Sequence, residues 1–123
     1  RNIFRAYRIS NEMVQKVLKR DSVSDLMGSN FSVSIPLLYR VNGYNEDYQE
    51  YWGEDGDLFI RLRNSGAKII GRKSLAIQYH LNHPRLIPSK QNQQKYYSLL
   101  NDLDYKRCKN GIIRESVENL VQS

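Results

Sequence analysis

The sequence predicts an α/β fold made of helices with a few short strands. Apolar residues recur at helical spacing in residues 9–20 and 54–64, whereas they alternate with serines between Phe31 and Ile35. Glycine and proline punctuate the chain between these segments, as they do at turns and helix ends. With 123 residues the chain has the length of one domain, taken here as residues 1–123.

Composition narrows the classes of function. The formal net charge is +6, which suits a nucleic acid, an anionic membrane surface or a phosphorylated substrate as partner, and equally suits a protein kept soluble by its charge. No apolar run is long enough to span a membrane, and no signal peptide is visible. Because the chain begins at Arg1, we expect it to be a piece of a longer protein. The single cysteine, Cys108, has no partner for an internal disulfide, which fits a reducing compartment.

The first half of the chain is predicted to contain two helices and one strand. Pro36 suits the first turn of a helix, and Asn42-Gly43 is a strong turn signal. The expected order is a helix at 9–20, a loop at 22–29, a strand at 31–35 and a short helix at 37–41.

The second half begins with a polar, aromatic loop at 44–52. A helix at 54–64 follows, and Ser65-Gly66 is expected to end it. The remaining expected elements are short strands at 68–71 and 75–79, an irregular segment between Pro84 and Pro88, a long helix at 90–109 and a last helical turn or two at 113–121.

The densest cluster of acids lies in Tyr51-Trp52-Gly53-Glu54-Asp55-Gly56-Asp57, where a loop passes into a predicted helix. Helical offsets of three, four and seven place Asp55 on the face of Leu58, Phe59 and Leu62, so we expect Asp55 to look into a cleft. Asp57 and Arg61, four residues apart, are expected to pair on the surface. A carboxylate at a helix N-terminus stays ionised, which suits a general base, but acids also favour first turns for helix stability alone.

Other candidate functional residues also have purely structural interpretations. His80 and His83 follow a predicted strand and could ligate a metal, but spacing alone favours structural or surface histidines. The nine tyrosines could stack on sugars or bases, or could be half-buried packing residues. Asp102-Leu103-Asp104 falls inside the predicted long helix, where it is expected to form a solvated face.

Several motifs in order carry a resemblance to a known family. These are Met27-Gly28-Ser29-Asn30-Phe31-Ser32, Val41-Asn42-Gly43-Tyr44-Asn45-Glu46-Asp47, Trp52-Gly53-Glu54-Asp55-Gly56-Asp57-Leu58, Arg61-Leu62, Gly66 and His80. They resemble the C-terminal half of the catalytic domain of a GT-A glycosyltransferase. The chain is most similar to the family 2 bacterial enzymes and to the β-1,4-galactosyltransferase C-terminal region. The core of the resemblance spans residues 28–83, and a helical C-terminal extension would occupy 89–123.

The resemblance implies roles for individual residues. Asp55 would be the base that deprotonates the acceptor hydroxyl, and Glu54 would contact the acceptor sugar or orient the loop. His80, with His83 as second choice, would complete the coordination of a Mn²⁺ or Mg²⁺ ion. The residues implied in acceptor or donor binding are Trp52, Gly53, Tyr51, Gly28 and Asn30.

The chain also departs from the family pattern. The galactosyltransferase motif Trp-Gly-Gly-Glu-Asp has one residue more than Trp52-Gly53-Glu54-Asp55, so the register of Trp52 is open. The Asp-x-Asp metal motif belongs to an N-terminal nucleotide-binding half that is absent here. Asp55-Gly56-Asp57 matches the Asp-x-Asp pattern, but it lies in the acceptor motif instead. The metal is therefore expected only together with the missing half, and the isolated chain is expected to be inactive.

The function expected from the resemblance is inverting transfer of a hexose, such as galactose or N-acetylgalactosamine, from a nucleotide sugar to a glycan. The donor is expected to be a UDP-sugar, and no nucleic acid is expected as partner. The parent would work in the cytoplasm, with peripheral association at the inner face of the membrane. The alternatives are a non-catalytic basic module that binds an anionic glycan or nucleic acid, and a degenerate transferase half kept for assembly.

Overall fold

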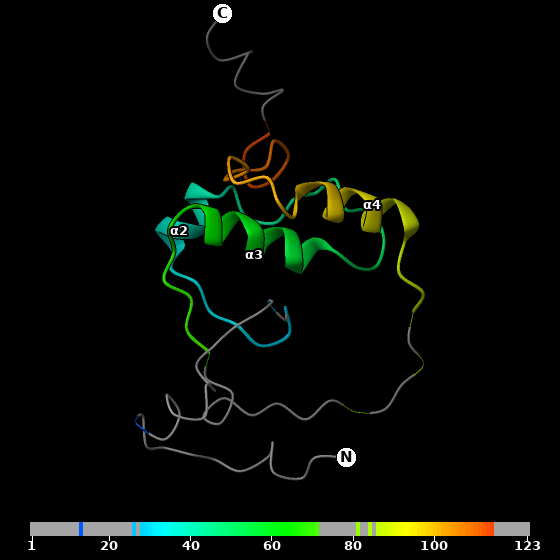
Figure 1. Cartoon of the computed structure of the whole chain (residues 1–123), viewed down its shortest axis with the longest axis horizontal. Coiled ribbons are helices and arrows are strands. Elements are labelled where there is room, and N and C mark those ends of the chain that lie inside the picture. Colours follow the sequence, from blue (N-terminus) through cyan, green and yellow to red (C-terminus); the bar gives the residue numbers. More distant parts are fainter. Residues whose placement is uncertain are drawn as a thin grey trace, which may run out of the picture. The chain divides into compact units, whose positions relative to one another are not determined.

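The computed structural model describes Met13, Leu26, residues 28–71, Leu81, Pro84 and residues 86–114 (Figure 1). Contacts divide the chain into two units, one of Arg1–Ser24 with Lys68–Pro84 and one of Asp25–Ala67 with Arg85–Ser123. Most described residues belong to the second unit. Its helices are α2 (Ile35–Arg40), α3 (Glu54–Asn64) and α4 (Lys90–Leu99).

Helix α3 forms the core of this unit. Its residues from Gly56 to Leu62 are all buried, and Leu58 and Ile60 are fully so. Acids occupy its first turn and arginines its last, which complements the helix dipole. Both predicted ends of α3 are confirmed, and Gly66 follows with a left-handed φ of 76°.

Helix α2 begins at Ile35, two residues earlier than expected, because Ser34 is extended and Pro36 suits the first turn. The predicted turn after it is confirmed. Asn42 and Gly43 both have left-handed φ values, 68° and 69°, and the Gly43 N–H donates to the Leu38 carbonyl at 2.9 Å.

Two predicted strands are wrong. Residues 31–34 and 68–71 have no ladder partner, and Ile35 belongs to α2 instead. Alternating apolar residues favour a strand only where a neighbouring strand satisfies the backbone groups. Across the described ranges, the β pairing is limited to an isolated bridge between Asn110 and Arg114. The strand expected at 75–79 lies outside the described residues, as does the helix expected at 9–20 except for Met13, which is helical.

The long helix expected at 90–109 is also wrong in its second half. Helix α4 starts as predicted, with Ser89 as N-cap, but ends at Leu99. The Asp102 carboxylate accepts from the N–H groups of Asp104 (3.0 Å) and Tyr105 (3.2 Å), which stabilises a turn in place of a helix. Asp102-Leu103-Asp104 therefore lies in this turn. Of the segment expected to be helical at 113–121, the described residues 113 and 114 are not helical.

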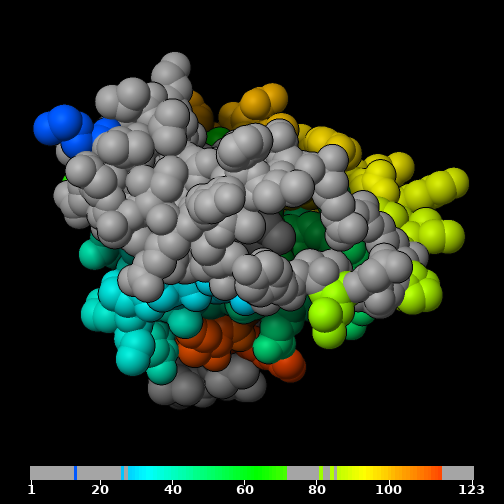
Figure 2. Space-filling model, turned by 90° about the horizontal axis from the view of Figure 1, so that it is seen from below, coloured from blue at the N-terminus to red at the C-terminus, as the bar shows by residue number. Residues whose placement is uncertain are grey.

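The segment around residue 110 returns to the turn after α2. The Asn42 amide donates to the carbonyls of Cys108 (3.0 Å) and Ile113 (2.8 Å), and the Ile113 N–H donates back to Asn42 Oδ1 at 2.8 Å. A Cβ at Gly111 would lie 1.9 Å from the Asn42 carbonyl oxygen, so only glycine fits this approach. Orange residues of this segment lie beside the teal α2 region in Figure 2.

None of the helices in the described part of the chain has the length and apolar character needed to cross a membrane.

Candidate active site

The loop that leads into α3 is tightly turned and is held by α4. Trp52 and Gly53 have positive φ values of 87° and 106°, a strained conformation for a bulky side chain such as tryptophan. The Ser89 N–H donates to the Tyr51 carbonyl at 3.2 Å, and the buried Asn92 amide donates to the Glu50 carbonyl at 2.8 Å. Helix α4 therefore fixes the backbone that positions the first turn of α3.

The carboxylate of Asp55 is held by two donors from different segments. The Gly28 N–H donates to Oδ2 at 2.8 Å, and the Tyr44 hydroxyl donates to Oδ1 at 3.1 Å. A Cβ at Gly28 would lie only 2.2 Å from Asp55 Oδ1, so glycine allows this approach. Asp55 is half-buried, and these two bonds fix the orientation of its carboxylate.

Asp55 lines a small open pocket of about 150 Å³. The pocket combines two carboxylates with aromatic rings, and no lysine or arginine is among its described lining residues. Glu54 Oε2 is buried and has no hydrogen-bond partner among the described residues. The lining residues are Leu26, Tyr51, Trp52, Gly53, Glu54, Asp55, Gly56 and Tyr96.

Three aromatic rings adjoin the pocket. Trp52 meets Tyr96 edge to face at 5.2 Å between ring centroids and meets Tyr97 at 6.1 Å in a tilted arrangement. The Tyr96 ring packs on α3 at Gly56, where an added Cβ would lie 2.5 Å from a ring carbon. In the sequence Tyr96 and Tyr97 are recognisable only as a tyrosine pair. Their contact with Trp52 was not predicted, because they are far from it along the chain.

The residues predicted from sequence fall into two groups. Trp52, Gly53, Tyr51, Glu54 and Asp55 come together in the pocket, and Gly28 reaches it through its bond to Asp55. Asn30 is exposed and is not among the pocket-lining residues. Tyr44 contacts Asp55, although no role in the site was predicted for it. It follows the Asn42-Gly43 turn, and this turn is the feature of the sequence that could have indicated its position.

The expectation that Asp57 and Arg61 pair on the surface is wrong, because both side chains are fully buried. Arg61 Nε donates to Asp57 Oδ1 at 2.6 Å, and Nη2 lies 2.6 Å from the same oxygen as an ion-pair contact. Arg61 Nη1 donates to the carbonyls of Val41 and Gly43, each at 2.6 Å. The pair thus ties α3 to the turn that carries Tyr44.

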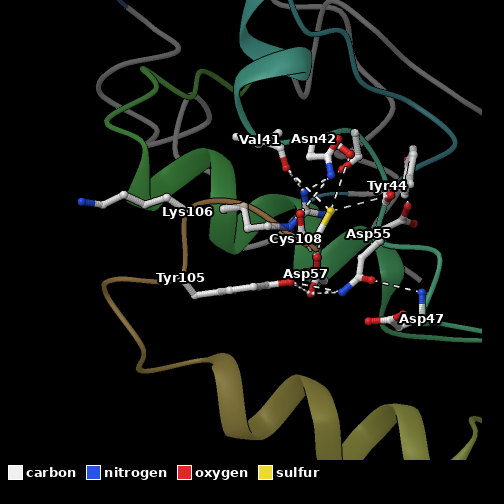
Figure 3. Close-up of polar contacts among 12 residues, drawn as sticks. Val41, Asn42, Tyr44, Asp47, Asp55, Asp57, Tyr105, Lys106 and Cys108 are labelled. Carbon is white, nitrogen blue, oxygen red and sulfur yellow. Dashed lines mark hydrogen bonds and ion pairs between the residues drawn. The ribbon is translucent and has the colours of Figure 1, made fainter. Parts of the chain in front are cut away.

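The buried Asp57 carboxylate accepts a hydrogen bond from a tyrosine hydroxyl. Tyr105 donates to Oδ2 at 2.9 Å. Figure 3 shows its side chain nearly edge-on, with the hydroxyl pointing toward Asp57. Burial, and then the charge of Asp57, raises the pKa of Tyr105 and of Tyr48. Burial, and then the charge of Asp55, raises the pKa of Tyr44 to about 12. These phenols therefore stay protonated at neutral pH, so that Tyr44 and Tyr105 can donate to the carboxylates.

We expect the stability of the fold to fall as pH rises from about 10 towards 12, because an unfolded tyrosine ionises near 10 and the folded Tyr44 only near 12. In that window the folded state binds more protons than the unfolded state, so the free energy of unfolding decreases with pH. Urea denaturation at stepped pH measures the decrease. Tyr44→Phe should make it shallower, whereas Tyr39→Phe, at an exposed position on α2, should leave it unchanged. Equal slopes for both variants would contradict this assignment.

The predicted metal ligands His80 and His83 lie outside the described residues. Within the described part of the chain, no three His, Cys, Asp or Glu side chains lie together as a metal site would require. The metal ion and its two histidine ligands therefore stay a prediction.

Comparison with protein families matches residues 9–84 to the family described as the N-terminal domain of galactosyltransferase. The match covers more than half of the chain, and the chain belongs to this galactosyltransferase family. No curated protein and no solved structure matched.

Membership of this family indicates a glycosyltransferase and, in general terms, a nucleotide-sugar donor and a glycan acceptor. The expected likeness to galactosyltransferases is thus confirmed, while a place in family 2 stays a prediction. The family description refers to an N-terminal domain, whereas the residue pattern led us to expect a C-terminal half. Which part of a complete catalytic domain this chain represents also stays a prediction.

Proposed function

We propose that this chain forms the acceptor side of an inverting glycosyltransferase that moves a hexose, such as galactose or N-acetylgalactosamine, from a UDP-sugar to a glycan. The observation that carries the proposal is the position of Asp55. Its carboxylate lies at the start of α3, fixed by Gly28 and Tyr44, and lines a pocket with aromatic walls. The family match supports the same class of reaction.

In the proposed reaction the acceptor hydroxyl enters the pocket and gives its proton to the Asp55 carboxylate. The hydroxyl oxygen forms a bond to the anomeric carbon as the bond from that carbon to the nucleoside diphosphate breaks, and this single displacement inverts the anomeric centre. The two donors on Asp55 hold its carboxylate in one orientation, which keeps the base within reach of the hydroxyl.

Glu54 has a complementary role in this proposal. Its side chain lines the same pocket, and in this proposal it contacts the acceptor sugar or orients the loop. Trp52, Tyr51 and Tyr96 provide the apolar surface against which a sugar ring packs.

The donor half of the site belongs to the proposal as well. A Mn²⁺ or Mg²⁺ ion, held in part by His80, would stabilise the charge that develops on the departing diphosphate. We place the parent enzyme in the cytoplasm, with peripheral association at the inner face of the membrane. The alternative of a basic module for anionic ligands is disfavoured at this pocket, because its described lining carries carboxylates and no cationic side chain.

The test is a transfer assay with the full gene product, UDP-hexoses and neutral acceptor saccharides, in which mass spectrometry detects the new glycoside. We expect a product whose anomeric configuration, read by NMR, is inverted relative to the donor. Transfer with retention would contradict the mechanism. Salt-sensitive nucleic-acid binding without any transfer would favour the non-catalytic alternative.

A further inference from the structure

We propose that helix α2 and the segment 106–112 that packs beside it form a surface that binds an anionic lipid bilayer. The surface adds a face and a class of lipid to the peripheral association proposed above, and it is independent of the chemistry at Asp55. None of its residues is among those that line the pocket. We call this face the α2 surface, and its residues are Ile35, Tyr39, Arg40, Lys106, Arg107, Lys109 and Ile112.

Helix α2 leaves apolar side chains in contact with solvent. None of its six residues is buried. Ile35 and Tyr39, four residues apart and so on one stripe of the helix, are 69% and 53% exposed. Ile112, 47% exposed, lies just beyond the end of α2, where a Cβ added at Gly43 would be 2.7 Å from its Cγ1. Exposed apolar side chains that are grouped in this way mark a surface for a protein or a membrane.

Cationic side chains border these apolar residues. Arg107 Nη1 donates to the carbonyls of Tyr39 (2.8 Å) and Arg40 (3.2 Å), which holds the loop that carries Arg107 against the end of α2. Arg40, Lys106 and Lys109 are exposed, and none of them forms an ion pair within the described part of the chain. Figure 3 shows the Lys106 side chain extending away from the buried contacts.

The acids of the adjoining loop do not neutralise this charge. The Glu46 N–H donates to the Asn110 carbonyl at 2.9 Å, which brings that loop beside the α2 surface. Glu46 is paired with Arg114 at 2.6 Å, however, and Asp47 with Lys95 at 3.1 Å. The α2 surface therefore carries a positive charge of its own, and an anionic partner is its electrostatic complement.

A bilayer suits this mixture of side chains better than a nucleic acid does. Cationic side chains attract the headgroups of anionic lipids, while apolar side chains enter the boundary between headgroups and acyl chains. Tyr39 has an apolar ring with a polar hydroxyl at its tip, a combination that favours this boundary. The phosphates of a nucleic acid would neutralise the charge but would offer Ile35 and Ile112 no apolar region to enter.

Sedimentation of the 123-residue chain with lipid vesicles tests the α2 surface. We expect binding to phosphatidylcholine vesicles that contain about one-third phosphatidylglycerol to be at least about 10-fold stronger than binding to phosphatidylcholine alone. Added salt should weaken the binding to the anionic vesicles, because it screens exposed charges.

Matched variants test the apolar part of the surface. Ile35→Ser should weaken binding to the anionic vesicles about 3- to 10-fold, because it removes an apolar side chain from the lipid boundary. The control is Ile87→Ser, at an isoleucine that is 90% exposed but lies outside the α2 surface, and it should stay within about 2-fold. Circular dichroism of each variant checks that the fold is retained.

A second pair of variants tests the charge at constant net charge. Arg40→Glu combined with Lys109→Glu should weaken binding to the anionic vesicles about 10-fold or more. Lys68→Glu combined with Lys90→Glu changes the net charge equally at exposed positions outside the α2 surface, and it should stay within about 3-fold.

The outcomes separate this inference from the proposed function. Equal binding to neutral and anionic vesicles, no binding to either, or equal effects of the matched variants would overturn the α2 surface. Tighter binding of a duplex oligonucleotide than of the anionic vesicles would overturn it in favour of a nucleic-acid partner. If the full gene product transfers hexose to soluble acceptors but the chain does not bind vesicles, the α2 surface fails and the transferase stands. Vesicle binding with the expected variant effects but without transfer has the opposite meaning.

Discussion

Replacing Asp55 with asparagine will lower the turnover of the enzyme about 100-fold or more. The amide keeps nearly the same shape but cannot take a proton from the acceptor hydroxyl, and loss of a general base costs on this scale. The variant should still fold, since the Gly28 N–H can donate to the amide oxygen while the Tyr44 hydroxyl accepts a hydrogen bond from the amide NH₂. Initial rates of transfer at saturating donor and acceptor measure the effect.

Two further variants make this result specific. Asp47→Asn removes an exposed carboxylate outside the pocket, and it should leave turnover within about 2-fold of the original. Gly28→Ala keeps Asp55 but places a Cβ where its carboxylate lies, so the base must move by about 1 Å and turnover should fall by up to about 100-fold. Near-normal turnover in the Asp55→Asn variant would contradict the assignment of Asp55 as the base.

Replacing Arg61 with methionine will lower the free energy of unfolding by about 3–5 kcal/mol, because it leaves the Asp57 carboxylate buried without its counter-charge. The substitution also releases the carbonyls of Val41 and Gly43, which Arg61 holds at 2.6 Å. Urea denaturation of the chain followed by circular dichroism measures the loss. Adding Asp57→Asn to Arg61→Met removes the unpaired buried charge and should restore part of the lost free energy of unfolding.

The chain offers a matched control for this burial argument. Arg114 and Glu46 also approach to 2.6 Å, but their side chains are 63% and 51% exposed. Arg114→Met should therefore cost no more than about 1 kcal/mol, as exposed ion pairs do. Comparable losses for Arg61→Met and Arg114→Met would show that burial does not set the strength of the Asp57–Arg61 pair.

Local signals in the sequence predicted correctly those features of the structure that depend on residues adjacent along the chain. The bounds of α3 follow from its first-turn acids, its apolar spacing and the Gly66 stop. The turn at Asn42-Gly43 and the Ser89 start of α4 follow in the same way, because each depends on the conformational preferences of two or three adjacent residues.

Predictions failed where distant residues compete for the same groups. Helical propensity predicted a helix to Lys109, but the Asn64 amide bonds the carbonyls of Asp102 (2.8 Å) and Tyr105 (2.9 Å), which favours a turn there. The i, i+4 spacing of Asp57 and Arg61 is that of a common surface pair. Their burial follows from the turn after α2 and from Tyr105, which the spacing does not reveal.

The sequence alone determined the start of α3 and placed Glu54 and Asp55 in its first turn, because helix phase is a local property of the chain. Its motif order also led to the galactosyltransferase family, which the family match confirms. Only the tertiary structure decided what surrounds Asp55. Gly28 and Tyr44 lie 27 and 11 residues away from it in sequence, and Tyr96 comes from another helix. Such contacts arise from the packing of whole elements, so no local pattern encodes them.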